Sequence, residues 1–185
     1  KIERSVMESI AESGDRVVVH QALKHLVVGG NALIYMSKDG LKLYPLSRYV
    51  VDRDGNGNVI EIVTKETVSK KLIKKIYPEY KEEESRSVVD EGSGVGTDEC
   101  VIYTHVKLDN NKWVWHQELN DKILPRSMGK APHDANPWLV LRFNSVDGEV
   151  YGRGRVEEFL GDLKSLEALS QAIVEGSAAA AKVVF

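Results

Sequence analysis

The sequence predicts an α+β fold: two N-terminal helices, a mostly antiparallel β body built from hairpins, and one long C-terminal amphipathic helix. Three observations lead to this prediction. Residues 1–28 have helical apolar spacing, residues 32–118 contain repeated hairpin turn signals, and one long helical pattern begins at residue 155. With 185 residues, of which 42% are apolar and 29% charged, the chain can bury a core of its own.

Residues 1–13 and 16–28 are expected to form the two N-terminal helices. In the first segment Ile2, Val6 and Ile10 recur at four-residue spacing with glutamates between them, which is the pattern of one helix face. The second segment has a similar apolar stripe, an aspartate before it that can cap its first turn, and a Gly-Gly-Asn sequence that ends it.

The body is expected to consist of antiparallel hairpins. An Asp-Gly pair at 39–40 and an Asp-Asn-Asn run at 109–111 are turn signals, and the flanking segments are those of β-strands. The expected strands are residues 32–36, 41–44, 49–53, 59–67, 99–108, 112–118 and 138–143.

Two segments interrupt the strand pattern. Residues 68–77 place apolar side chains opposite four lysines, which predicts a short helix that ends at Pro78. Residues 81–98 are charged and then rich in Gly and Ser, with little to bury, so we expect a mobile linker within the body.

Residues 155–183 are predicted to form one long helix with an apolar stripe. A stripe of this length needs cover, either from the preceding residues or from another copy of the same helix. Its large side chains include Phe159, Leu163, Leu166, Leu169 and Ile173.

The chain enters this helix through a short joint, in which glycines on both sides of an arginine predict a flexible hinge. The two arginines of the joint either solvate the helix start or take part in an interface. The joint consists of Tyr151, Gly152, Arg153, Gly154 and Arg155. We therefore expect a body over residues 1–150 and a helical part over residues 151–185. The chain starts and stops inside helical or apolar patterns, which indicates a fragment whose last helix is truncated.

Composition excludes several classes of protein. A net charge of −3 lacks the positive excess of proteins that grip nucleic acid tightly. The single cysteine, Cys100, excludes an internal disulfide. No run of about 18 apolar residues is present, so no membrane-spanning helix is predicted.

One loop resembles a calcium site. Asp52, Asp54, Asn56 and Asn58 stand at the ligand positions that open an EF-hand loop. The position of its final glutamate holds Val63, and the flanking segments are strand-like where an EF-hand has helices. A tight hairpin turn is the favoured interpretation, because such turns need the same residue types. A weak calcium site is the alternative.

The other candidate motifs are incomplete. Residues 92–97 resemble a phosphate-binding loop but lack its lysine and follow two acidic residues, so a linker is favoured. The five histidines show no metal-ligand spacing, and no hydrolase signature joins a serine, a histidine and an aspartate. The sequence therefore predicts no enzyme and no cofactor.

Four runs together resemble a known family. They are ALKHLVVGGNALIY (22–35), KLYPLSRYVVDRDGNGNVIEIVTKE (42–66), IYTHVKLD (102–109) and DGEVYGRGRVEEFLGDLKSLEALSQAIVE (147–175). They are similar to the portal, or head-to-tail connector, proteins of short-tailed bacteriophages. The last run is the most specific, because Tyr151-Gly152-Arg153 precedes EEFLGDL within it. The resemblance covers nearly the whole chain and suggests the central fragment of such a protein.

The resemblance implies a structural subunit of a dodecameric ring at one capsid vertex of the virion, assembled in the host cytoplasm. The ring would form the channel through which double-stranded DNA is packaged and ejected, without tight DNA binding. Its implied partners are the terminase large subunit, which holds the ATPase activity, the tail adaptor and scaffold or capsid proteins, but no membrane.

The resemblance further implies that the body corresponds to the wing and the last helix to a stem helix, whose apolar stripe is expected to face a second stem helix and neighbouring subunits. A competing hypothesis is a cytosolic calcium- or nucleotide-binding domain, which rests on residues 52–58 or 92–97.

Overall fold

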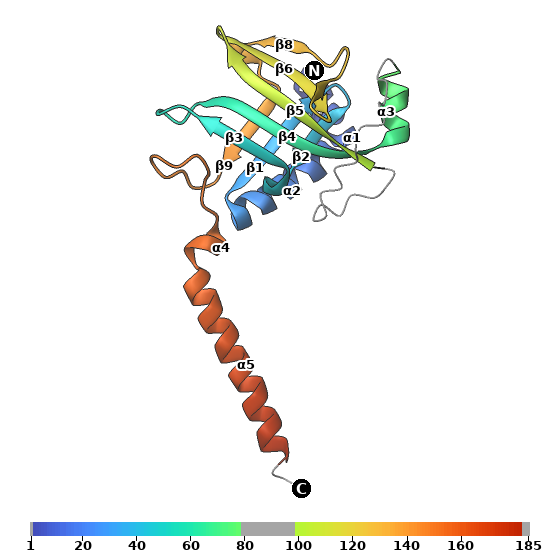
Figure 1. Cartoon of the computed structure of the whole chain (residues 1–185). Helices are drawn as coiled ribbons and strands as arrows, with labels where there is room; N and C mark the ends of the chain where they lie inside the picture. Colours follow the sequence, from blue (N-terminus) through green and yellow to red (C-terminus); the bar gives the residue numbers. More distant parts are fainter. Residues whose placement is uncertain (1, 79–98, 183–185) are drawn as a thin grey trace.

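The structure, a computed structural model, describes residues 2–78 and 99–182 as a body of sheets and helices from which one long helix projects (Figure 1). The helices are α1 (Ile2–Glu12), α2 (Asp15–Gly29), α3 (Lys70–Ile76), α4 (Arg155–Glu158) and α5 (Leu160–Lys182). The strands are β1 (Asn31–Ser37), β2 (Gly40–Tyr44), β3 (Tyr49–Arg53), β4 (Val59–Ser69), β5 (Glu99–Asp109), β6 (Lys112–Leu119), β7 (Lys122–Ile123), β8 (Gly129–Pro132) and β9 (Trp138–Arg142). The α+β prediction is confirmed.

The described strands form two antiparallel sheets. One has the order β2-β1-β9, so the last long strand pairs with the first across most of the chain. The other has the order β3-β4-β5-β6-β7, and β8 also pairs with β6. The predicted hairpins all form, because each turn signal joins two strands that are neighbours in a sheet.

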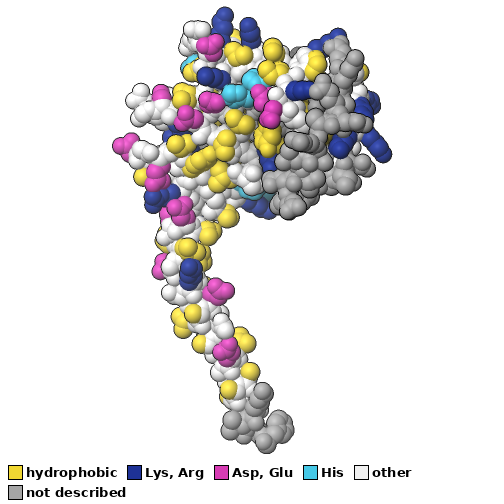
Figure 2. Space-filling view, in the orientation of Figure 1, with side chains coloured by type: hydrophobic (Ala, Val, Ile, Leu, Met, Phe, Trp, Pro, Cys, Tyr) yellow, Lys and Arg dark blue, Asp and Glu magenta, His cyan; other side chains and the backbone are white. Residues whose placement is uncertain are grey.

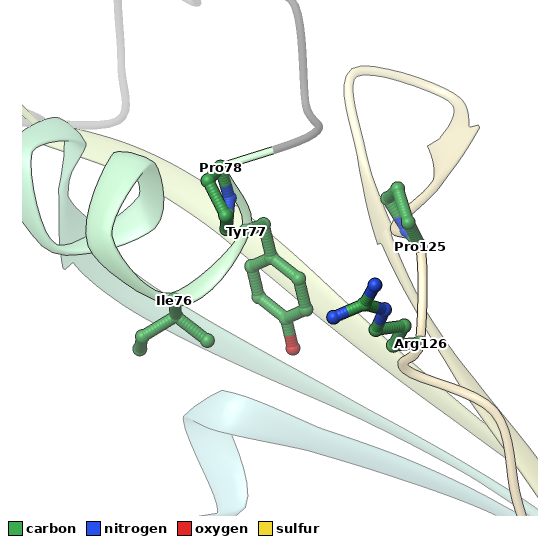
Figure 3. Close-up of a pocket in the computed structure, with 5 residues that line it drawn as sticks. All are labelled: Ile76, Tyr77, Pro78, Pro125 and Arg126. Atoms are coloured by element: carbon green, nitrogen blue, oxygen red, sulfur yellow. The ribbon is translucent and has the colours of Figure 1, made fainter.

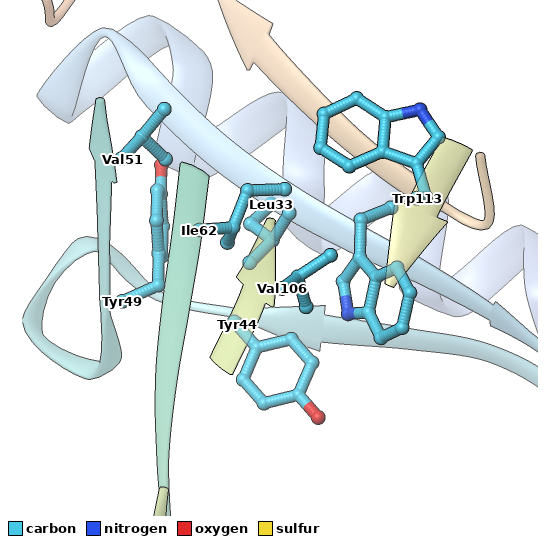
Figure 4. Close-up of a cluster of buried hydrophobic side chains, with 8 residues drawn as sticks. Leu33, Tyr44, Tyr49, Val51, Ile62, Val106 and Trp113 are labelled. Atoms are coloured by element: carbon cyan, nitrogen blue, oxygen red, sulfur yellow. The ribbon is translucent and has the colours of Figure 1, made fainter. Parts of the chain in front are cut away.

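The core lies between the two sheets. Side chains alternate along β1: Leu33 points toward the larger sheet and joins its core cluster, whereas Ala32 and Ile34 pack under Ala22 of α2. The smaller sheet is therefore a middle layer, covered by α2 on one face and by the larger sheet on the other. Figure 4 shows the inter-sheet cluster, which contains Leu33, Tyr44, Tyr49, Val51, Ile62, Val106, Trp113 and Trp138.

A second cluster closes one end of the larger sheet. Ile73 of α3 packs on Ile102, Leu119 and Leu124, all of them buried. The prediction of a short helix here is confirmed, but its start was placed too early. Residue 68 extends β4 by pairing with Cys100, and the helix begins only at Lys70. The predicted mobile linker at 81–98 lies outside the described residues.

The sequence predicts one continuous helix over residues 155–183, but in the structure this segment is divided into two helices. Phe159 has φ −108° and ψ 19°, away from α-helical values, and separates the short α4 from the 23-residue α5. At about 1.5 Å per residue, α5 is about 35 Å long. Every side chain described from residue 155 to residue 181 is exposed.

On the face shown in Figure 2, acidic and basic side chains are interspersed. Apolar side chains gather on the middle of the body and along the projecting helix. Within residues 2–78 and 99–182, no helix combines the length and apolar character needed to cross a membrane.

Candidate functional site at the junction of body and helix

The described part of the body contains a smaller and a larger hollow. The smaller, about 20 Å³, lies where Tyr77 and Pro78 approach Pro125 and Arg126 (Figure 3), and holds little more than one water. The larger is about 300 Å³, and several of its polar side chains pair with one another. Glu66 accepts hydrogen bonds from Lys42 Nζ at 2.8 Å and from the Tyr44 hydroxyl.

The calcium-like loop is a hairpin turn in the structure. Asp54 Oδ1 accepts the backbone N–H groups of Asn56 and Asn58 at 3.0 and 2.7 Å, and Asp54 Oδ2 accepts Asn58 Nδ2 at 2.9 Å. Hydrogen bonds to Asn58 and to the turn backbone lower the pKa of Asp54. Asp52 Oδ1 accepts the backbone N–H of Arg53. The loop is therefore a hairpin turn between β3 and β4, as the favoured interpretation predicts, and both side-chain oxygens of Asp54 accept hydrogen bonds that stabilise it.

Two histidines have partners that their sequence spacing did not reveal. His105 and His116 lie opposite each other on β5 and β6, with ring centroids 5.2 Å apart. The Nε2 atoms pair with Glu61 and, at 2.8 Å, with Glu118. The sequence analysis missed the first pair because Glu61 lies 44 residues away. In the described part of the chain, no three His, Cys, Asp or Glu side chains are grouped to hold a metal ion.

The predicted joint is held by several contacts with segments that are distant in sequence. Asn31, only 4% exposed at the start of β1, reaches across to it. Its Oδ1 accepts the Gly152 N–H at 2.7 Å, and its Nδ2 donates to the carbonyls of Gly152 at 2.6 Å and Gly29 at 3.0 Å. One side-chain amide thus pairs with both backbone groups of Gly152, as a neighbouring strand would. The sequence analysis treated Asn31 only as a helix stop, and no local signal marked its second role.

The glycines of the joint allow backbone to pass against backbone. A Cβ on Gly152 would lie 2.8 Å from the Gly30 carbonyl oxygen, and one on Gly154 would overlap the carbonyl of Val28. Gly30 itself has φ 75°, where L side chains are strained, and ends α2 with its N–H bonded to Leu26. These positions exclude side chains for lack of space.

Further contacts fasten the segment before α4. The Tyr151 hydroxyl accepts the Val51 N–H at 3.1 Å, Arg53 Nε donates to the Val150 carbonyl at 3.0 Å, and Arg153 N–H donates to the Asn144 carbonyl at 2.8 Å. The chain is therefore tied to β3 and to the segment after β9 before it turns into α4.

The two arginines of the joint are engaged within the chain. Arg153 pairs with Glu149 at 2.5 Å, which lowers the pKa of Glu149 and raises that of Arg153. Arg155 pairs with Glu158 at 3.1 Å, and its guanidinium lies over the rings of Phe143 and Phe159 at 5.5 and 5.8 Å. These contacts place both cations at the base of α4.

Beyond the joint, the apolar stripe of the last helix is bare. Leu166, Leu169 and Ile173 are 62, 61 and 66% exposed, and Phe159 and Leu163 are also exposed. The body does not cover this stripe. The sequence allows two kinds of cover for this stripe, the preceding residues or another copy of the helix. In the structure the preceding residues do not provide it.

The family model for the bacteriophage head to tail connecting protein matches residues 1–185 of this chain. The chain belongs to this family of head-to-tail connecting proteins. It is 40% identical to the portal protein of Enterobacteria phage T3 and 36% identical to that of Escherichia phage T7, in each case over 99% of this chain and 34% of the relative. The portal protein of Pseudomonas phage phiKMV is 31% identical over 92% of this chain and 33% of the relative.

The chain therefore spans about a third of the length of these connector relatives. Their names agree with the family suggested by the runs at 22–35, 42–66, 102–109 and 147–175, so that identification is confirmed. None of these relatives is named for calcium or nucleotide binding. The joint and the projecting helix are consequently features of a phage connector.

Proposed function

We propose that this chain is the central part of a portal subunit, in which the body is a wing and α5 is a stem helix. Copies of the subunit assemble into a ring, most simply a dodecamer, at one vertex of the capsid. The ring is the channel for packaging and ejection of double-stranded DNA, and it serves as the docking platform for the terminase large subunit and the tail adaptor, with scaffold or capsid proteins around it. The family match along the whole chain supports this proposal.

The projecting helix is the structural observation that carries the oligomeric part of the proposal. Seven large apolar side chains of α5 and the residue before it are at least 45% exposed: Phe159, Leu160, Leu163, Leu166, Leu169, Ile173 and Val174. Fully burying such side chains is worth about 1.5–3 kcal/mol each. A partner must cover them, and in a ring that partner is a second stem helix or the neighbouring subunit.

The role is structural, and the subunit takes no cofactor. In the larger hollow, Tyr44 and Lys42 both pair with Glu66. The chain's net charge of −3 suits a channel along which DNA slides. Tight phosphate contacts would add affinity through counterion release and would oppose sliding. The ring is assembled in the host cytoplasm and then belongs to the virion.

The test is ring formation by the full-length protein that contains this chain. Leu166→Ser with Leu169→Ser should abolish the rings seen by electron microscopy and leave subunits or small oligomers in light scattering. The matched control is Lys164→Ser with Glu167→Ser, which changes two charged residues of the same helix and should leave the rings intact. Rings that form equally well with both pairs of substitutions would contradict the assignment of the stripe to subunit contacts.

A further inference from the structure

The passage from body to α5 consists of two parts with different packing. Up to α4, backbone and side chains are fastened on several sides. From Phe159 onward, the helix is surrounded by solvent in the described structure. The sequence predicted a hinge at residues 151–155, where glycines are frequent. The contacts there instead hold the segment against the body, and we call the pair Asn31 and Gly152, together with the close approach of Gly154 to Val28, the clamp.

The clamp is centred on Asn31 and Gly152. Both backbone groups of Gly152 are bonded to the Asn31 amide, and Gly154 lies so close to Val28 that no side chain fits between them. Rotating this segment away from the body would break these buried hydrogen bonds and leave their polar groups unpaired, which is unfavourable for every group that stays buried. Glycine supplies close approach here, not mobility.

The next irregular position is Phe159. Its φ and ψ of −108° and 19° interrupt the helix, and its backbone N–H bonds back to Arg155 at 3.0 Å while its carbonyl bonds forward to Leu163 at 3.0 Å. Gly161 follows two residues later with open space around it. Glycine is a weaker helix former than alanine, so the glycine at position 161 weakens the first turn of α5.

We infer that the connector has a fixed joint and a separate pivot: Asn31 locks α4 to the body, and α5 changes direction about residues 159–161. The pivot lets one rigid body carry its stem helix at different angles. In the proposed ring, changes in the angle of α5 would alter the bore of the channel without unpacking the body. Only this last consequence rests on the proposed function.

The two parts can be separated by distance measurements between pairs of nitroxide labels. One label stands at Lys107, exposed on β5, and the second at Glu157 on α4 or at Glu175 near the end of α5. Cys100→Ser removes the one cysteine of residues 1–185, and any cysteine elsewhere in the full-length protein is replaced as well. Labelled full-length protein is diluted with unlabelled protein so that only distances within one subunit are measured. Residue 175 lies about 24 Å from the pivot, so a swing of about 20° moves it by about 8 Å.

We expect a narrow distance distribution from Lys107 to Glu157 and a broad one from Lys107 to Glu175. Gly161→Ala, whose new methyl group meets open space, should narrow the second distribution and leave the first unchanged. Equal widths at the two positions in the unmodified protein, or no response to Gly161→Ala, would overturn the pivot.

Asn31→Asp tests the clamp. At neutral pH its carboxylate keeps the acceptor for the Gly152 N–H but loses the donor to the Gly152 carbonyl, so the Lys107–Glu157 distribution should broaden. Below the pKa of the new acid, its protonated form can donate again, and the distribution should narrow. A variant with an unchanged distribution at both pH values would overturn the role of Asn31. Because these distances lie within one subunit, loss of rings and loss of the clamp give different readouts.

Discussion

The side chain of Asn31 holds the start of β1 against Gly152, which lies 121 residues later in the chain. A backbone strand would need several residues to do the same. The amide suits this place because it offers a donor and an acceptor side by side, which matches the carbonyl and N–H of Gly152. At neutral pH an aspartate would supply only the acceptor, and a leucine of similar size would supply neither group.

The stability of the fold should depend strongly on this side chain. Asn31→Ala removes three hydrogen bonds and leaves buried groups of Gly152 without their partner, so we expect the free energy of unfolding to fall by about 2–4 kcal/mol in urea denaturation. The control is Asn56→Ala in the exposed turn after β3, which should change it by less than about 0.5 kcal/mol. Equal losses in the two variants would contradict the role given to Asn31.

Gly154 should tolerate no larger residue. In Gly154→Ala the new methyl group would overlap the carbonyl of Val28, and backbone cannot move aside as a flexible side chain can. We expect a loss of about 3 kcal/mol, visible as a lower midpoint in thermal melting. Gly176→Ala, where the new methyl group meets open space on α5, should leave that midpoint unchanged or slightly higher.

The turn held by Asp54 should weaken in acid. Its hydrogen bonds lower the pKa in the folded state below the ordinary value of 3.8, so protons bind the unfolded chain more readily. The stabilisation is present above about pH 4 and is lost as pH falls through the lowered pKa. Asp54→Asn removes this titration. The difference in unfolding free energy between the two proteins should shrink on acidification, and a constant difference would refute the assignment.

At the scale of elements, local patterns located most helices and strands but missed those boundaries that depend on tertiary pairing. The turn signals at 39–40 and 109–111 were sufficient because hairpins are local. The end of β4 was not predictable from propensity, because Val68 and Ser69 extend the strand only by pairing with Cys100 and Glu99. The interruption at Phe159 was hidden by apolar spacing that remains helical on both sides of it.

Exposure of the stripe predicts how α5 responds to truncation of its side chains. Leu169→Ala should change the unfolding free energy of the isolated chain by less than about 0.5 kcal/mol, because Leu169 is 61% exposed. Leu33→Ala, in the core between the sheets with no exposed surface, should cost about 2–5 kcal/mol. Urea denaturation of both variants makes the comparison. A large loss for Leu169→Ala would mean that the body covers the helix.

At the scale of the whole molecule, the sequence predicted the fold class and, through the resemblance, the family, but it did not predict the layers. Pairing of β1 with β9 joins residues more than a hundred positions apart, and no local pattern encodes it. The same holds for the site. The glycines of the joint at 151–155 were interpreted as flexible, because their close neighbours Val28 and Gly30 are distant in sequence and no local pattern reveals them.

We propose that the folded body extends beyond residue 150, because the contacts of Tyr151, Gly152 and Arg153 join it to β1, β3 and the segment after β9. A chain that ends at Phe159 keeps Tyr151, Gly152 and α4 in their contacts, so its melting temperature should equal that of the longer chain. A chain that ends at residue 150 loses the partners of Asn31 and Val51 and should melt at a lower temperature. Equal melting of both shortened chains would show that the joint adds nothing to the body.

The crossing of Gly30, Gly152 and Gly154 also sets an order of events during synthesis. A ribosome releases α2 and β1 long before it reaches residue 152, so Asn31 lacks its Gly152 partner until late in synthesis. Contacts of such sequence separation close late. The direction of α5 relative to the body is therefore among the last features that the nascent chain acquires.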